Sequence, residues 1–495
     1  MTNRAILSVL PVLLPAGLLL AQDTVTLKVE TRAVQINVAV KDHQGRPIRG
    51  LRKEDFTVTD DGRRREIEVF SSEDEPAPVA APVNLPPNVF SNRFRTADSN
   101  RRITAILLDA VSTPFEHQAY ARAQAIHAVE TMTGGESVAI YVLDEANLSI
   151  LQNYTSERER LLIALNSWVP RQPPAPDRSG DFNPRGGRRA PPIIRESPRG
   201  IRGMLVQNRI ESTLEALRLI SRSMGGASGR KSLLWITAGF PPYTNYRDRI
   251  EATIAAVNQH NVAVYSVDTR GLLPGRFAGI TISTMQDLAE STGGQAYYNR
   301  NDVGQAIVEA MDDSRHTYSL AFYLPEKDVD GQSHHLTVKV DRPGLDLHYR
   351  RAYEATINTQ QQPTKKQASL ETELLSPLDR STLGIDAKVE IVQAERGRSL
   401  HIVIVLNPST VVQKQPDGTP AMKLSELFVV TGAAGRVLGR MSTSVTVEVP
   451  PGKPVGSFSH TIPLKAGAQS VQMVVRDTVS GHTGTLTIPV SKLVP

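Results

Sequence analysis

The segment between residues 103 and 132 constrains the fold more than any other part of this chain. Residues 103–108 are almost entirely apolar, as expected of a buried strand, and they lead directly into Asp109. A loop with Ser112 and Thr113 follows, and the apolar stripe in residues 116–132 predicts an amphipathic helix. Doubly wound parallel sheets bind ligands and metals beyond the carboxyl ends of their strands. The segment therefore predicts a strand–loop–helix unit with Asp109 as a candidate ligand at the sheet edge.

The alternation of strand and helix patterns continues to residue 314. Further strand-like runs occupy residues 137–143, 148–151, 232–237, 262–267 and 295–298. Helical stripes occupy residues 156–168, 206–224, 249–259, 285–291 and 303–314. Strands that alternate with helices predict βαβ units and a mostly parallel sheet covered on both faces. Because no helix separates the second and third strand-like runs, these two are expected to form a hairpin.

The flanking regions show the period-two pattern of half-buried strands. Apolar and polar residues alternate in residues 34–40 and 56–58, and Asp61-Gly62 is a typical hairpin turn. Six strand-like runs between residues 400 and 490 predict a C-terminal β-sandwich of the immunoglobulin or fibronectin type. The predicted fold class is a multidomain α/β plus β protein. Its central doubly wound, mostly parallel sheet is flanked by a small N-terminal β domain and the C-terminal sandwich.

With 495 residues, the chain is long enough for several domains. We expect a signal peptide at residues 1–21, the N-terminal β domain at 24–72 and a proline-rich linker at 73–100. The central domain is expected at 101–325, with an arginine- and proline-rich insertion at 169–203 and a β extension at 326–353. A second linker at 354–383 precedes the C-terminal sandwich at 384–495.

The first residues predict export. Arg4 precedes an uncharged, mostly apolar run over residues 5–21, which is typical of a secretory signal peptide. We therefore expect a secreted or periplasmic protein, with an uncleaved N-terminal membrane anchor as the alternative. Later runs are too short or too polar to span a membrane. The absence of cysteine excludes disulfides and zinc–thiolate sites.

Positive charge is concentrated in the predicted insertion. The formal net charge is +5, and residues 171–202 alone hold eight arginines against three acidic residues. Because the rest of the chain is close to neutral, the pattern argues against a nucleic-acid partner. Four arginines of the insertion are candidate contacts to an acidic surface on a protein partner: Arg185, Arg188, Arg189 and Arg195.

Several blocks resemble von Willebrand factor A (vWA) domains. The loop Asp109-Ala110-Val111-Ser112-Thr113 is similar to their first metal-binding loop, Asp-x-Ser-x-Ser. The other blocks are GRKSLLWITAGF, NVAVYSVDTRG, LAESTGGQAYYN and DDSRHTYSLAFY, which begin at residues 229, 261, 288 and 312. Together with the flanking segments, they resemble the VWFA-related family described from acidobacterial genomes, over residues 25–353. The resemblance implies a vWA-like domain with a divalent-cation site at the sheet edge.

The resemblance also implies that this cation site is degenerate. The residues that match its ligand positions are Asp109, Ser112, Thr113 and Thr213, with Ser212 as an alternative to the last. Val111 stands where vWA domains have a hydroxyl, and Ala238 stands where they have an aspartate. Mg²⁺ prefers six oxygen ligands in near-octahedral geometry, and two of the expected oxygens are missing. We expect either weak Mg²⁺ or Mn²⁺ binding or none.

Some of these residues have simpler explanations. Thr113-Pro114-Phe115-Glu116 matches a capping box, in which the threonine hydroxyl accepts a hydrogen bond from a helix N–H. Asp109 could accept backbone N–H bonds without a metal. His334 and His335 are neighbours in a strand-like run, so their rings should point to opposite faces and cannot bind one ion.

These observations favour a binding function over catalysis. The sequence has no HExxH, GxSxG or glycine-rich phosphate-loop motif, and we expect no enzymatic activity. The favoured hypothesis is a protein-binding or adhesion module at the cell envelope or outside the cell. The alternative is a metal-independent scaffold of an envelope assembly, and the remote alternative is an extracytoplasmic hydrolase.

Overall fold

The computed structural model describes most of the chain in separate stretches. These are residues 33–72, 85–92, 102–132, 136–144, 147–170, 198–227, 231–240, 246–272, 277–313, 316–355, 370, 382–394, 397–406, 413–414, 420–448, 456–478 and 481–494. The predicted signal peptide lies outside the described residues, as do Arg185, Arg188, Arg189 and Arg195.

The largest sheet has six strands in the order β11-β10-β9-β6-β7-β8. Its strands are β6 (Arg102–Asp109), β7 (Glu136–Asp144), β8 (Asn147–Thr155), β9 (Lys231–Thr237), β10 (Val262–Asp268) and β11 (Ala296–Tyr297). Neighbouring strands pair in parallel, except that β7 and β8 form an antiparallel hairpin. The hairpin expected from the missing helix is therefore confirmed.

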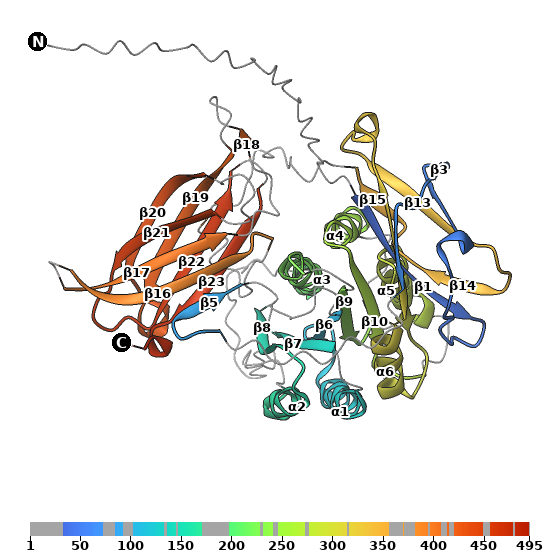
Figure 1. Ribbon diagram of the computed structural model, residues 1–495. Coiled ribbons are helices and arrows are strands. Elements are labelled where there is room, and N and C mark those ends of the chain that lie inside the picture. The colour runs from blue at the N-terminus through green and yellow to red at the C-terminus, as the bar shows by residue number, and fades with distance from the viewer. Residues whose placement is uncertain are drawn as a thin grey trace, which may run out of the picture.

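Helices cover both faces of this sheet (Figure 1). On one face lie α1 (Phe115–Thr131), α2 (Arg158–Ser167) and α6 (Val303–Asp313); on the other lie α3 (Pro198–Ser223), α4 (Arg247–Gln259) and α5 (Phe277–Ser291). The alternation of side chains along β6 supplies both cores, because Ile106 and Leu108 face the first and Ala105 and Leu107 face the second. Among the described helices, none combines the length and apolar character needed to cross a membrane.

The N-terminal strands share their sheets with strands that follow the last helix. One sheet has the order β14-β1-β12-β4 and the other β15-β13-β2-β3. The strands are β1 (Ala33–Asp42), β2 (Phe56–Asp60), β3 (Arg63–Arg65), β4 (Val69–Ser72), β12 (Thr317–Tyr323), β13 (Ser333–Val340), β14 (Leu345–His348) and β15 (Ala352–Glu354). Residues from both segments form one apolar core. In Figure 1 the blue N-terminal strands accordingly lie among the yellow strands of residues 333–354.

The C-terminal strands form two further antiparallel sheets around one core. The first has the order β21-β17-β16-β5, and the second contains β18, β19, β22 and β23 with β20 paired to β19. Their bounds are β5 (Val89–Ser91), β16 (Ile385–Ala394), β17 (Gly397–Leu406), β18 (Gln413–Lys414), β19 (Pro420–Thr431), β20 (Val437–Glu448), β21 (Gly456–Pro463), β22 (Ser470–Asp477) and β23 (Thr483–Pro489). Strand β5 comes from the segment expected to be a proline-rich linker.

The predicted fold class is wrong for the chain. We expected a multidomain α/β plus β protein built on a central doubly wound, mostly parallel sheet, but the described residues are mainly β-structure. They form five small sheets, of which four are entirely antiparallel, and six α-helices. Parallel pairing is confined to the six-stranded sheet. The physical reason is that strands such as β1 and β2 pair with antiparallel partners that are distant in sequence, and periodicity does not identify these partners.

Candidate functional site

Asp109 lies at the end of β6, the strand that pairs with β7 on one side and β9 on the other. Its side chain is buried, as are those of Ser112 in the following loop and Thr213 on α3. The structure therefore brings together three of the four predicted ligand residues, one of which lies more than 100 positions away. The parallel strands and α3 explain this meeting, because their ends converge at the carboxyl edge of the sheet.

Protein donors surround the Asp109 carboxylate. Oδ1 accepts a hydrogen bond from the backbone N–H of Ser112 at 3.0 Å. Oδ2 accepts from Thr213 Oγ1 at 3.1 Å, from Trp235 Nε1 at 3.0 Å and from Thr237 Oγ1 at 3.3 Å. We call these five residues the Asp109 cluster. The cluster satisfies both carboxylate oxygens without any external ligand.

The electrostatics of the cluster reflect its burial. Burial raises the pKa of Asp109, while the hydrogen bonds from Trp235, Ser112 and Thr213 oppose this rise. The Ser112 and Thr213 hydroxyls also lie 3.2 Å from each other. A buried carboxylate is costly unless it is hydrogen-bonded, so these donors stabilise the edge of the sheet.

The residues present do not fit the Mg²⁺ site that the resemblance implies. Two of the donors that point at the Asp109 carboxylate are N–H groups, the backbone N–H of Ser112 and the indole N–H of Trp235, and neither can act as a ligand. Val111 and Ala238 offer no side-chain oxygen at the two substituted positions. The Asp109 cluster is a network of hydrogen bonds centred on one carboxylate rather than an open coordination shell.

Thr113 does not cap the helix as expected. Helix α1 begins at Phe115, its N-cap residue is Pro114, and no side-chain cap hydrogen bond forms there. Instead, the side chain of Gln118 donates hydrogen bonds to the backbone carbonyls of Ala110 and Thr113, at 3.0 and 2.9 Å. Gln118 therefore holds the loop against the first turn of α1.

Sequence reasoning missed Trp235 and Thr237 as members of the cluster. Both lie on β9, two residues apart, so they share one face of the strand. A signal was present, because a tryptophan in a buried strand needs a partner for its indole N–H.

Exposed apolar side chains lie on segments that follow three strands of the six-stranded sheet. Leu272 follows β10, Tyr298 follows β11 and Phe115 begins α1. The hydroxyl of Tyr120 donates to the backbone carbonyl of Asn301 at 3.0 Å, and the backbone N–H of Leu272 donates to the Asn301 side chain at 3.1 Å. All four large side chains are exposed, and we call them the apolar rim: Phe115, Tyr120, Leu272 and Tyr298.

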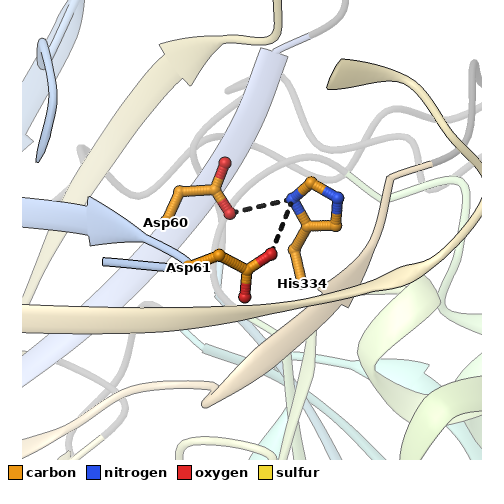
Figure 2. Close-up of side chains that lie close together, drawn as sticks. All are labelled: Asp60, Asp61 and His334. Atoms are coloured by element: carbon orange, nitrogen blue, oxygen red, sulfur yellow. Dashed lines mark hydrogen bonds and ion pairs between the residues drawn. The ribbon is translucent and has the colours of Figure 1, made fainter. Parts of the chain in front are cut away.

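A second polar cluster lies on the neighbouring strands β2 and β13 of one antiparallel sheet (Figure 2). His334 Nδ1 lies 3.0 Å from Asp60 Oδ1 and 3.5 Å from Asp61 Oδ2. Within the described part of the chain, these three residues form the group whose ligand atoms, all within 4.8 Å of one another, could hold a metal. His334 is buried and His335 is exposed, in agreement with the expectation that their rings point to opposite faces.

The neighbours of His334 shift its pKa. Burial disfavours the imidazolium, but hydrogen bonds and charge interactions with Asp60 and Asp330 outweigh burial and raise the pKa of His334. Sequence patterns do not predict this cluster, because Asp60 and His334 are 274 positions apart.

Comparisons with known proteins give weak structural likeness only. No protein-family model matches the sequence, and no curated protein matches it. Among solved structures, the N-terminal domain of TFIIH p34 is 13% identical with a TM-score of 0.24, and it aligns over 43% of this chain and 99% of its own.

Two other solved structures are similar at the same level. The VWA domain of SpRpn10 is 11% identical, with a TM-score of 0.23, over 42% of this chain and 93% of its own. The human COPII-coat protein Sec24c is 8% identical, with a TM-score of 0.22, over 79% of this chain and 43% of its own. The structural neighbours thus include a vWA domain, but these scores are too low to transfer a function to this chain.

Proposed function

We propose that this chain is an exported, non-catalytic protein-binding module that engages its partner through the apolar rim without a metal ion. The exposure of the rim at the carboxyl edge of the parallel sheet is the observation that carries the proposal. Large apolar side chains gathered on a surface mark sites of protein association, and aromatic residues are enriched in such sites. Ligands of parallel sheets also bind at this edge.

The Asp109 cluster supports a binding mode that is independent of Mg²⁺. Because both carboxylate oxygens accept hydrogen bonds within the protein, the cluster holds β6, β9 and α3 together at the carboxyl edge of the sheet. A rigid support lowers the entropic cost of presenting a binding surface. Membership of the VWFA-related family is part of the same proposal and rests on the sequence blocks quoted above.

Export is the second part of the proposal and rests on the apolar run over residues 5–21. N-terminal sequencing of the protein recovered from its native host tests it. We expect the mature chain to begin shortly after residue 21. A cytoplasmic protein that retains Met1 would contradict export.

Affinity capture with matched variants tests the rim. Wild-type protein, Leu272→Asp and Ile163→Asp are immobilised and exposed to envelope and culture extracts, with and without a chelator. Leu272 belongs to the rim and is 58% exposed, whereas Ile163 lies on α2 and is 68% exposed. We expect a partner that wild type and Ile163→Asp recover equally and that Leu272→Asp depletes about tenfold, as for an interface hot spot. Equal recovery by all three would contradict the rim, and loss of the partner in chelator would contradict metal independence.

A further inference from the structure

We propose that Asp60, Asp61 and His334 form a binding site for a divalent transition-metal ion of the Zn²⁺ type. Asp60 ends β2 and Asp61 occupies the following turn, while His334 lies on β13, which pairs antiparallel with β2. The pairing register places Leu336 opposite Asp60, so His334 reaches the turn from the neighbouring strand. Figure 2 shows one oxygen of Asp60 and one of Asp61 directed at the Nδ1 atom of His334.

The distances between the ligand atoms suit a coordinated ion. His334 Nδ1 lies 3.0 Å from Asp60 Oδ1 and 3.5 Å from Asp61 Oδ2. Metal–ligand bonds of about 2.1 Å imply ligand–ligand separations of about 3.0 Å in an octahedron and about 3.4 Å in a tetrahedron. An ion could therefore enter with small movements of the three side chains.

Each proposed ligand has its other polar atom held by a neighbour. Asp60 Oδ2 accepts from Arg65 at 3.0 and 2.6 Å, and Asp61 Oδ1 accepts from the backbone N–H of His335 at 2.9 Å. His334 Nε2 lies 3.2 Å from Asp330 Oδ1. Histidine ligands of metals ordinarily donate their second ring nitrogen to a carboxylate in this way. The surrounding groups thus orient one atom of each residue toward the common point.

A proton on Nδ1 does not satisfy all the oxygens around it. Besides the two aspartates, the Tyr353 hydroxyl lies 3.3 Å from Nδ1. One N–H can form one well-aligned hydrogen bond, whereas a cation can bind several oxygens at once. Tyr353 or water could complete the coordination shell.

Three carboxylates face the His334 ring in this region: Asp60, Asp61 and Asp330. Asp61 is half-exposed at the turn, which leaves a route for an ion from solvent. Because the ligand set combines one imidazole with two carboxylates, it suits Zn²⁺ better than Mg²⁺ or Ca²⁺.

Calorimetric titration of Zn²⁺ into the chelator-treated full-length protein tests the proposal. We expect saturable binding of one ion to wild type and a loss of affinity of at least about tenfold in Asp61→Asn and in His334→Gln, because metal sites depend this strongly even on their outer partners. Asn is a conservative choice at position 61, since it tolerates the positive φ of 46° found there. Mg²⁺ should not compete at equal concentration.

The adjacent histidine provides the matched control. His335→Gln removes an exposed imidazole one residue away and should bind Zn²⁺ as wild type does. Thermal unfolding of each metal-free variant shows whether a variant that loses Zn²⁺ binding is still folded. If His334→Gln does not fold, Asp61→Asn still tests the site. Absence of saturable Zn²⁺ binding to wild type, or unchanged affinity in Asp61→Asn, would overturn the proposal.

Discussion

At the scale of single residues, hydrogen bonds decide what Asp109 can do. Its carboxylate ends a buried strand, where vWA-type sheets would place a cation, yet Trp235 and two threonines donate to it. A buried polar group left without such partners would be strongly destabilising. Asp109 therefore acts as a structural acceptor that joins β6 to β9 and α3.

Replacing Trp235 by phenylalanine tests this role. Trp235→Phe keeps an aromatic ring in the core but removes the N–H that lies 3.0 Å from Asp109 Oδ2. We expect the free energy of unfolding to fall by about 1–3 kcal/mol, the usual cost when a buried charged acceptor loses a donor. Urea unfolding, with hydrogen exchange of β6 and β9, measures the change. Trp168→Phe is the control for removing an indole outside the cluster, and an equal loss in both variants would argue against a special role for Trp235.

A buried pair in the C-terminal sandwich predicts a pH effect. Glu426 Oε2 on β19 lies 2.7 Å from His460 Nε2 on β21. Burial raises the pKa of Glu426 to about 7 and lowers the pKa of His460. Because its pKa is higher in the folded state, Glu426 stabilises the fold fully below pH 4.5, and this contribution is lost as the pH rises to about 7. His460 has the opposite pH dependence, because its pKa is lower in the folded state. Its contribution to stability is present above pH 6.5 and is lost on acidification.

The two single variants should therefore change stability in opposite directions with pH. Relative to wild type, Glu426→Gln should become more stable as the pH rises from 5 to 7, because it lacks the contribution that declines. His460→Gln should become less stable over the same interval. Thermal unfolding at pH 5, 6 and 7 measures both trends, and parallel trends in the two variants would contradict the inferred pair.

At the scale of elements, local sequence patterns predicted individual strands and helices but not which distant strands pair with each other. The apolar run that became β6 and the stripe that became α1 were found within one or two residues, because burial imposes their periodicity. Strand β1 was also predicted, but its pairing with β12 was not, since nothing local in an antiparallel strand identifies a partner 280 positions away. Likewise, the sequence contains a capping motif at Thr113, but the Gln118 side chain forms the hydrogen bonds to the backbone carbonyls of this loop.

A buried ion pair connects β1 to the end of α6. Lys41 Nζ lies 2.5 Å from Asp313 Oδ2, and both side chains are buried. We expect Asp313→Asn to lower the free energy of unfolding by about 3–5 kcal/mol, because it leaves the Lys41 ammonium without its carboxylate. The exposed Glu290 on α5 is the control, and Glu290→Gln should change stability by less than about 0.5 kcal/mol. Equal effects of the two substitutions on urea unfolding would show that the pair does not stabilise the molecule.

At the scale of the whole molecule, strands near the start of the chain pair with strands that lie hundreds of residues later. Residues 33–72 complete their sheets only with residues 317–354, and β5 completes a sheet with β16. This return brings Asp60 to His334, so the candidate metal site could not be predicted from either segment alone. By contrast, the resemblance to vWA domains implies one site with Asp109, Ser112, Thr113 and Thr213, and the structure brings Asp109, Ser112 and Thr213 together.

The central claim is that the Asp109 cluster is closed by protein hydrogen bonds and binds no Mg²⁺. Trp235 reports on it directly, since its indole N–H donates to Asp109 and the chain has two tryptophans. The decisive measurement is the indole N–H resonance of Trp235 in ¹⁵N-tryptophan-labelled protein during Mg²⁺ titration, assigned by Trp168→Phe. We predict a resonance that Mg²⁺ does not move and that Asp109→Ala shifts. A saturable Mg²⁺-dependent shift that disappears in Asp109→Ala would contradict the claim.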